Sequence, residues 1–155
     1  MAPPINRRLI LATAIAAPFA AVLPNLAMAT SPPVFNKDGL AINGYDPVGY
    51  FDQGEAVEGS DAHMLKWMGS MWRFASAQNM ATFESDPRAF APRYGGYCAF
   101  AMAKGAIARS VPTAWTVHEN KLYLNQSKIV RALWKRNIPE FVRDADMHWP
   151  GILDT

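Results

Sequence analysis

The stretch Ala91-Pro92-Arg93-Tyr94-Gly95-Gly96-Tyr97-Cys98-Ala99-Phe100 lies just past the middle of the chain and contains its single cysteine. Glycine loses more conformational freedom on folding than any other residue, so the adjacent pair predicts a turn that other residues do not easily adopt. The alanine-rich residues that follow predict a short helix beginning at or near Cys98 and ending at Gly105. Cys98 would then lie in the first turn, where free amides and the helix dipole favour a thiolate.

Cys98 has two interpretations that the sequence leaves open with similar weight. Free cysteines are among the most buried residue types and often act as small apolar side chains. A glycine turn that opens a helix can instead expose a catalytic thiol. With one cysteine in the chain, an internal disulfide is excluded, which slightly favours the functional interpretation of Cys98.

The first 29 residues have the pattern of an export signal. Arg7 and Arg8 precede an apolar run from Leu9 to Leu23, and Ala27-Met28-Ala29 fits the small-x-small cleavage rule. The run contains prolines and is short for a membrane span. We therefore expect cleavage after Ala29, a periplasmic or secreted protein, and no stable membrane anchor after cleavage.

Net charge and composition limit the classes of partner that the chain could bind. The chain has 15 basic and 13 acidic residues, and the two arginines of residues 1–29 account for the excess of +2. The remainder is formally neutral and offers no basic stripe, so we expect no nucleic-acid partner. Its length is that of one ordinary domain, and its aromatic content is sufficient for a hydrophobic core.

Two β-hairpins are predicted by alternating strands around two-residue connections. The paired strands are residues 62–67 with 70–75, around Met68-Gly69, and residues 114–118 with 121–125, around Glu119-Asn120. Helix starts are indicated by Asp46-Pro47, Ser76, Asp86-Pro87, and Ser127 or Asn125, and a last helix is expected from Pro139 to about His148. Asp46 is interpreted as a helix cap in preference to a catalytic carboxylate.

These elements predict a small α+β domain over residues 41–155, with an antiparallel sheet built from two hairpins, several short helices and a C-terminal helical pair. Residues 30–40 contain two prolines and are expected to form a flexible leader.

Several motifs together resemble one family. They are Ile42-Asn43-Gly44-Tyr45-Asp46-Pro47-Val48, Trp72-Arg73-Phe74-Ala75-Ser76, Tyr94-Gly95-Gly96-Tyr97-Cys98-Ala99 and Lys121-Leu122-Tyr123-Leu124-Asn125. In this order they are similar to exported YHS domain-containing (seleno)proteins, and the resemblance covers nearly the whole of residues 30–155. It implies that some relatives carry selenocysteine, at the position of Cys98, which in turn implies a functional chalcogen there.

The chain also departs from the metal-handling YHS domains that it resembles. Those domains carry cysteines after the Asp-Pro-Val motif and after the phenylalanine of the second strand, where this chain has Gly49 and residues 75–79. Leu65 occupies the position expected for the family histidine, with His63 two residues earlier. A zinc site built from cysteine pairs is therefore excluded.

The first functional hypothesis is an exported metal-binding protein with a copper ion. Cys98 and Met102 are four residues apart and lie on one helical face, and a thiolate with a thioether suits Cu(I). His63, His118 or His148 would complete the site, with His63 as the chosen candidate. Met102 is better explained as a core residue than as a ligand. A metal-handling protein would be the partner.

The second hypothesis is thiol redox chemistry at Cys98. The chain has no resolving cysteine, so a thiol of a partner protein would have to complete the cycle. Arg93 is the nearest cation in sequence that would lower the pKa of the thiol.

The third hypothesis is a non-catalytic module that binds a ligand or another protein. The candidate ligand-binding residues surround the glycine pair, namely Arg93, Tyr94, Gly95, Gly96 and Tyr97. Hydrolase chemistry is not supported, because no nucleophile elbow and no paired carboxylates occur.

Overall fold

The computed structural model describes residues 30–155. The predicted export signal, residues 1–29, lies outside the described residues. Within the described part, no helix is both long and apolar enough to cross a membrane.

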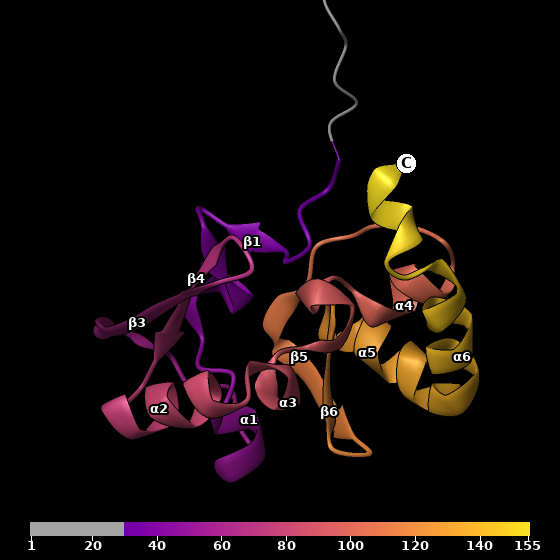
Figure 1. Cartoon of the computed structure of the whole chain (residues 1–155). Coiled ribbons are helices and arrows are strands. Elements are labelled where there is room, and N and C mark those ends of the chain that lie inside the picture. The colour runs from indigo at the N-terminus through magenta and orange to yellow at the C-terminus, as the bar shows by residue number, and fades with distance from the viewer. Residues whose placement is uncertain (1–29) are drawn as a thin grey trace, which may run out of the picture.

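The fold is the small α+β domain expected from the sequence, and it has two halves (Figure 1). The first half is a four-stranded mixed sheet with short helices. Its elements are β1 (Asn36–Lys37), β2 (Leu40–Ala41), the 3-10 turn η1 (Ile42–Gly44), α1 (Gly49–Asp52), β3 (Ser60–Trp67), β4 (Ser70–Phe74), α2 (Ala77–Ser85) and α3 (Pro87–Phe90).

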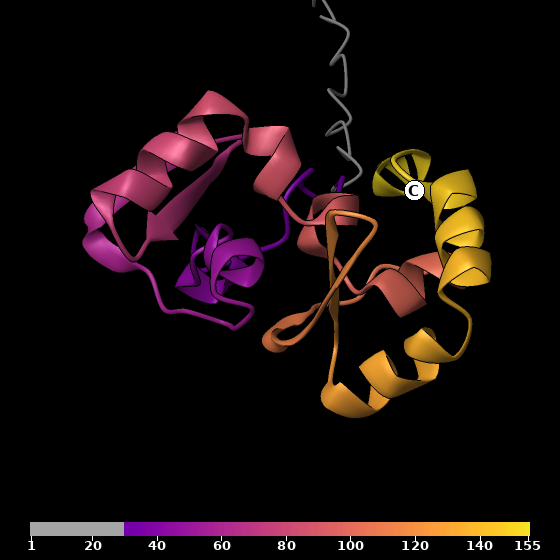
Figure 2. The ribbon, with the colours of Figure 1, turned by 90° about the horizontal axis from the view of Figure 1, so that it is seen from below.

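The second half is a hairpin covered by helices. Its elements are η2 (Arg93–Gly96), α4 (Ala99–Ala103), β5 (Val111–His118), β6 (Lys121–Asn125), α5 (Lys128–Trp134), η3 (Lys135–Asn137), α6 (Ile138–His148) and η4 (Gly151–Asp154). Figure 2 shows the β5–β6 hairpin between the sheet half and the three helices α4, α5 and α6.

The sheet has the order β1-β2-β4-β3, in which β2 and β4 are parallel and the other pairs are antiparallel. The β3–β4 hairpin turns at Met68-Gly69, and both residues have positive φ, at 47° and 81°. The β5–β6 hairpin turns at Glu119-Asn120 with φ of 48° and 56°. Both turns match the primed geometry that suits the twist of a hairpin, so both predicted hairpins are confirmed.

The predicted helix caps are confirmed at three positions. The side chain of Ser76 accepts a hydrogen bond from the backbone amide of Asn79. In the same way Asp86 accepts from the amide of Ala89, and Ser127 from the amide of Val130. Asp46 differs. The side chain of Asp46 accepts a hydrogen bond from the backbone amide of Val48 at 2.8 Å, but α1 begins only at Gly49. Asp46 is therefore not the N-cap residue of α1.

Asp46 is fully buried and connects three segments. Besides the Val48 amide, its carboxylate accepts the amide of Ala75 after β4 at 2.8 Å and the side-chain amide of Asn79 in α2 at 2.7 Å. A buried carboxylate is tolerated when its oxygens are hydrogen-bonded in this way. The role of Asp46 is therefore structural.

The core consists of two clusters. One lies around Trp72, Phe74 and Phe83 and extends to Leu122 and Leu124 of β6, so it joins the two halves. The other lies between η2 and the C-terminal helices around Tyr94, Tyr123 and Trp134. Aromatic rings within each cluster are in contact, as in the Trp72–Phe83 pair at 5.0 Å and the Tyr123–Trp134 pair at 4.9 Å. Such contacts add to the stabilisation from burial.

The turn Tyr94-Gly95-Gly96 links the two halves along the chain, and its three residues all have positive φ, at 57°, 59° and 82°. A Cβ atom on Gly95 would lie 2.1 Å from the carbonyl oxygen of Pro33 and 3.0 Å from the Trp149 ring. The amide of Phe35 donates to the carbonyl of Gly95 at 2.9 Å. Gly95 thus has both a conformational and a steric requirement for glycine.

The N-terminal residues 31–35 are packed, which differs from the flexible leader expected from the two prolines. The amide of Ser31 donates to the carbonyl of Leu153, the hydroxyl of Tyr97 donates to the carbonyl of Pro32 at 2.8 Å, and Val34 is buried. No local pattern predicts this packing, because the partners lie sixty or more residues away.

The Gly95→Ala substitution should lower the free energy of unfolding by about 3 kcal/mol, because the new methyl group meets the Pro33 carbonyl in addition to the strain of positive φ. Gly54→Ala is the matched control, since Gly54 has φ of 68° with no atom within 4 Å of the added Cβ. The Gly54→Ala substitution should lower the free energy of unfolding by about 1 kcal/mol. Urea unfolding of both variants measures the difference. Equal losses of unfolding free energy in the two variants would contradict the steric role of Pro33.

Candidate ligand-binding cleft

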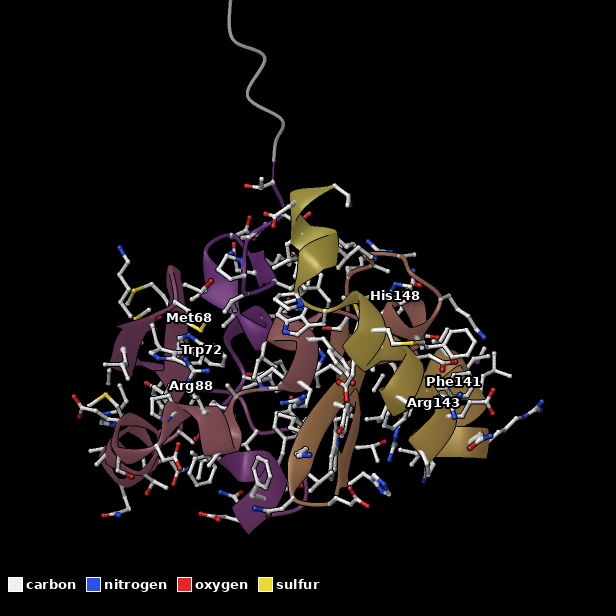
Figure 3. All side chains as sticks on the ribbon, turned by 45° about the vertical axis from the view of Figure 1, so that its right-hand side comes forward. Met68, Trp72, Arg88, Phe141, Arg143 and His148 are labelled. Carbon is white, nitrogen blue, oxygen red and sulfur yellow. The ribbon has the colours of Figure 1, made fainter. Side chains whose placement is uncertain are left out.

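An open cleft of about 200 Å³ lies where the two halves meet. The hairpin β3–β4 contributes Trp67, Met68 and Trp72, and the segment after α6 contributes Trp149. The remaining lining residues are Pro33 and Val34 from the N-terminal segment, Arg88 from α3, and Ala91, Pro92, Arg93, Tyr94 and Gly95 from the central turn. Figure 3 labels Met68, Trp72 and Arg88, which lie near one another in that view.

The hairpin wall of the cleft is rigid. The rings of Trp67 and Trp72 pack edge-on with centroids 5.6 Å apart, and Phe83 from α2 supports both. The indole nitrogen of Trp72 donates to the backbone carbonyl of Trp67 at 3.0 Å. Met68, at the tip, is 43% exposed. These contacts hold the two indoles together and leave Trp72 only 1% exposed, so Trp67 and Met68 provide most of the exposed surface of this wall.

The opposite wall is formed by the central turn. The Tyr94 ring packs edge-on to Trp149 at 6.2 Å, and its hydroxyl donates to the Asp146 carboxylate at 3.0 Å. Burial and the Asp146 hydrogen bond raise the pKa of the Tyr94 phenol far above its usual value. Tyr94 therefore stays protonated and holds the turn against α6.

The only charged side chains that line the cleft, among the described residues, are two arginines. Arg93 lies 3.5 Å from Asp146 and its guanidinium is 5.7 Å from the centroid of the Tyr94 ring. Arg88 is exposed in the last turn of α3, and within residues 30–155 it has neither an ion pair nor a side-chain hydrogen bond. The cleft is consequently apolar with a cationic edge.

Cys98 lies on the inner side of the same turn and does not reach the cleft. Its side chain is 1% exposed, and its Sγ donates to the side-chain oxygen of Asn125 at 3.7 Å. That oxygen also accepts the amide of Phe100 at the start of α4, at 3.2 Å. As predicted, α4 begins directly after Cys98 and Gly105 follows its end with φ of 69°. The amide at the helix start is thus already satisfied by Asn125.

The proposed copper ligands do not form a preassembled site. Cys98 and Met102 are one helical turn apart but both are fully buried in the second half. His63 lies on β3, which packs on β4 and α2, whereas α4 packs on α5, α6 and β6. Among residues 30–155, no three His, Cys, Asp or Glu side chains gather closely enough to hold a metal ion. His63 is therefore not brought to Cys98 and Met102 in this fold, whereas the His148 ring lies beside Gly105 at the end of α4.

Three of the five candidate ligand-binding residues line the cleft, namely Arg93, Tyr94 and Gly95. Gly96 and Tyr97 are buried on other sides of the turn. Gly96 packs on Pro92, and Tyr97 contacts Phe35 and Trp149 while its hydroxyl binds Pro32.

The sequence interpretation missed the tryptophans, Met68 and Arg88. The available signal was the placement of Trp67 and Met68 beside a tight hairpin turn, which puts their side chains at the end of a sheet. Trp149 carried no such signal, because its place depends on the packing of α6.

Comparisons of the chain with protein-family models, with curated proteins and with solved structures find no match. The resemblance to YHS proteins therefore remains a prediction based on the quoted motifs. The geometry of the cleft is therefore the basis for assigning a function.

Because Cys98 is buried, its thiol should react with Ellman's reagent only when the structure opens. We expect the rate in the folded protein to be lower by about a thousandfold or more than in the same protein unfolded in urea. The unfolded protein is the internal control for thiol content. Labelling of the folded protein at the rate of a free thiol would instead support the redox hypothesis.

Proposed function

We propose that this protein is a non-catalytic binding module that holds a small, planar ligand in the cleft between its two halves. The observation that carries the proposal is the convergence of three tryptophans and two arginines from four separate segments on one open cleft. Small-molecule sites are typically concave and mainly apolar, with a few polar groups that orient the ligand.

The arrangement of the backbone supports the same proposal. Tyr94 is a non-glycine residue in the left-handed region, and it lies in the wall of the cleft. Strained backbone of this kind is often found at ligand sites, where the surrounding structure holds it in place. Here the Asp146 hydrogen bond and the contact of Gly95 with Pro33 supply that support.

Copper binding and thiol redox chemistry at Cys98 stay predictions. The burial of Sγ and the distance of β3 from α4 in the fold favour the cleft over Cys98 as the functional site. Loading the protein with Cu(I) without oxygen, beside a Cys98→Ala variant, tests the copper hypothesis separately. Export through residues 1–29 also stays a prediction.

Ligand binding is tested by titrating isotope-labelled protein with three naphthalene probes of matched shape, namely 2-naphthoate, 2-naphthamide and 2-naphthylmethylammonium. At least one probe should bind with a dissociation constant of about 1 mM or below. Its NMR shifts should centre on the indole signals of Trp67, Trp72 and Trp149.

Ala91→Phe, which fills the cleft, should abolish these shifts. Ala81→Phe, on the exposed surface of α2, is the matched control and should retain them. Met68→Ala provides a second cleft variant at a partly exposed residue, and it should weaken binding several-fold. The proposal fails if no probe shifts the indole signals, or if the shifts persist unchanged in Ala91→Phe.

A further inference from the structure

The charge of the cleft further limits the chemical class of ligand that it can bind. Both charged groups on the lining are guanidinium groups, and no carboxylate within residues 30–155 lines it. A bound cation would face two like charges, while a neutral ligand could accept hydrogen bonds from the arginines but would not compensate their charge. An anionic group on the ligand is the only charge state that gains from both arginines.

Arg88 and Arg93 are both available to a ligand. Arg88 has no carboxylate partner in the described part of the chain. Arg93 is paired with Asp146 at 3.5 Å, and both side chains are nearly half exposed. An ion pair of this length and exposure contributes little stability, so an incoming anion can compete for Arg93 at low cost.

The shape of the site fits a carboxylate on an aromatic ring. A guanidinium presents its donors in a planar fork that matches the two oxygens of a carboxylate. The tryptophan walls favour stacking or edge contacts with a flat apolar body. The volume of about 200 Å³ accommodates a body of one or two rings.

We infer that the cleft selects small aromatic carboxylates, with Arg88 and Arg93 as the groups that bind the carboxylate and the tryptophans as the walls around the ring. This inference rests on the proposed binding function of the cleft. It adds the ligand class and identifies two specificity-determining residues.

The test compares 2-naphthoate with its neutral isostere 2-naphthamide in the same NMR titration of the full protein. The carboxylate should bind about tenfold more tightly, because charge-assisted hydrogen bonds are the stronger ones. Arg88→Gln and Arg93→Gln should each weaken 2-naphthoate binding by about threefold to tenfold while leaving 2-naphthamide within about twofold. Arg136→Gln, at an exposed position in η3, is the matched control and should change neither.

The outcomes separate the two proposals. Equal affinities for 2-naphthoate and 2-naphthamide, both abolished by Ala91→Phe, would overturn the anion selectivity and leave the binding function standing. Tight 2-naphthoate binding that both arginine variants retain would overturn the assigned residues. If none of the naphthalene probes shifts the indole signals, the binding function and the ligand class both fail.

Discussion

The close approach of the N-terminal segment to Gly95 constrains the central turn of the fold. The Pro33 carbonyl occupies the space where any other residue at position 95 would place its Cβ. Two residues later, the backbone amide of Phe35 donates a hydrogen bond to the carbonyl of Gly95. This contact brings Pro33 and Val34 to the cleft and sets the central turn against Trp149. The cleft therefore depends on a position that only glycine can occupy.

The parts of the fold that could be predicted are those whose cause is local. The hairpin turns at Met68-Gly69 and Glu119-Asn120 follow from two residues between alternating strands, and the cap at Ser76 acts over three residues. Such signals need no tertiary information. The glycine pair was recognised as a required turn for the same reason, although its partner at Pro33 was not.

The cleft could be predicted only in part, because its walls come from positions 33 to 149 in the sequence. Proximity to the glycine pair correctly indicated that Arg93, Tyr94 and Gly95 lie together. It did not show that Tyr97, three residues after Tyr94, directs its hydroxyl to Pro32 and away from the cleft. Which face of a turn a side chain takes is decided by tertiary packing, and here the packing partner is the N-terminal segment.

The turn also explains why the features that favoured a reactive Cys98 lead to a buried one. Three successive positive φ values bend the chain inward, so that Cys98 forms a bridge with Leu124 in β6 and its amide donates to Ala108. Asn125 then takes both the Phe100 amide and the Cys98 thiol as donors to one oxygen. The free amide that would stabilise a thiolate at the start of a helix is thus already hydrogen-bonded within the core. In the same turn the Arg93 side chain stays partly exposed and lines the cleft, which makes the cleft the accessible part of this turn.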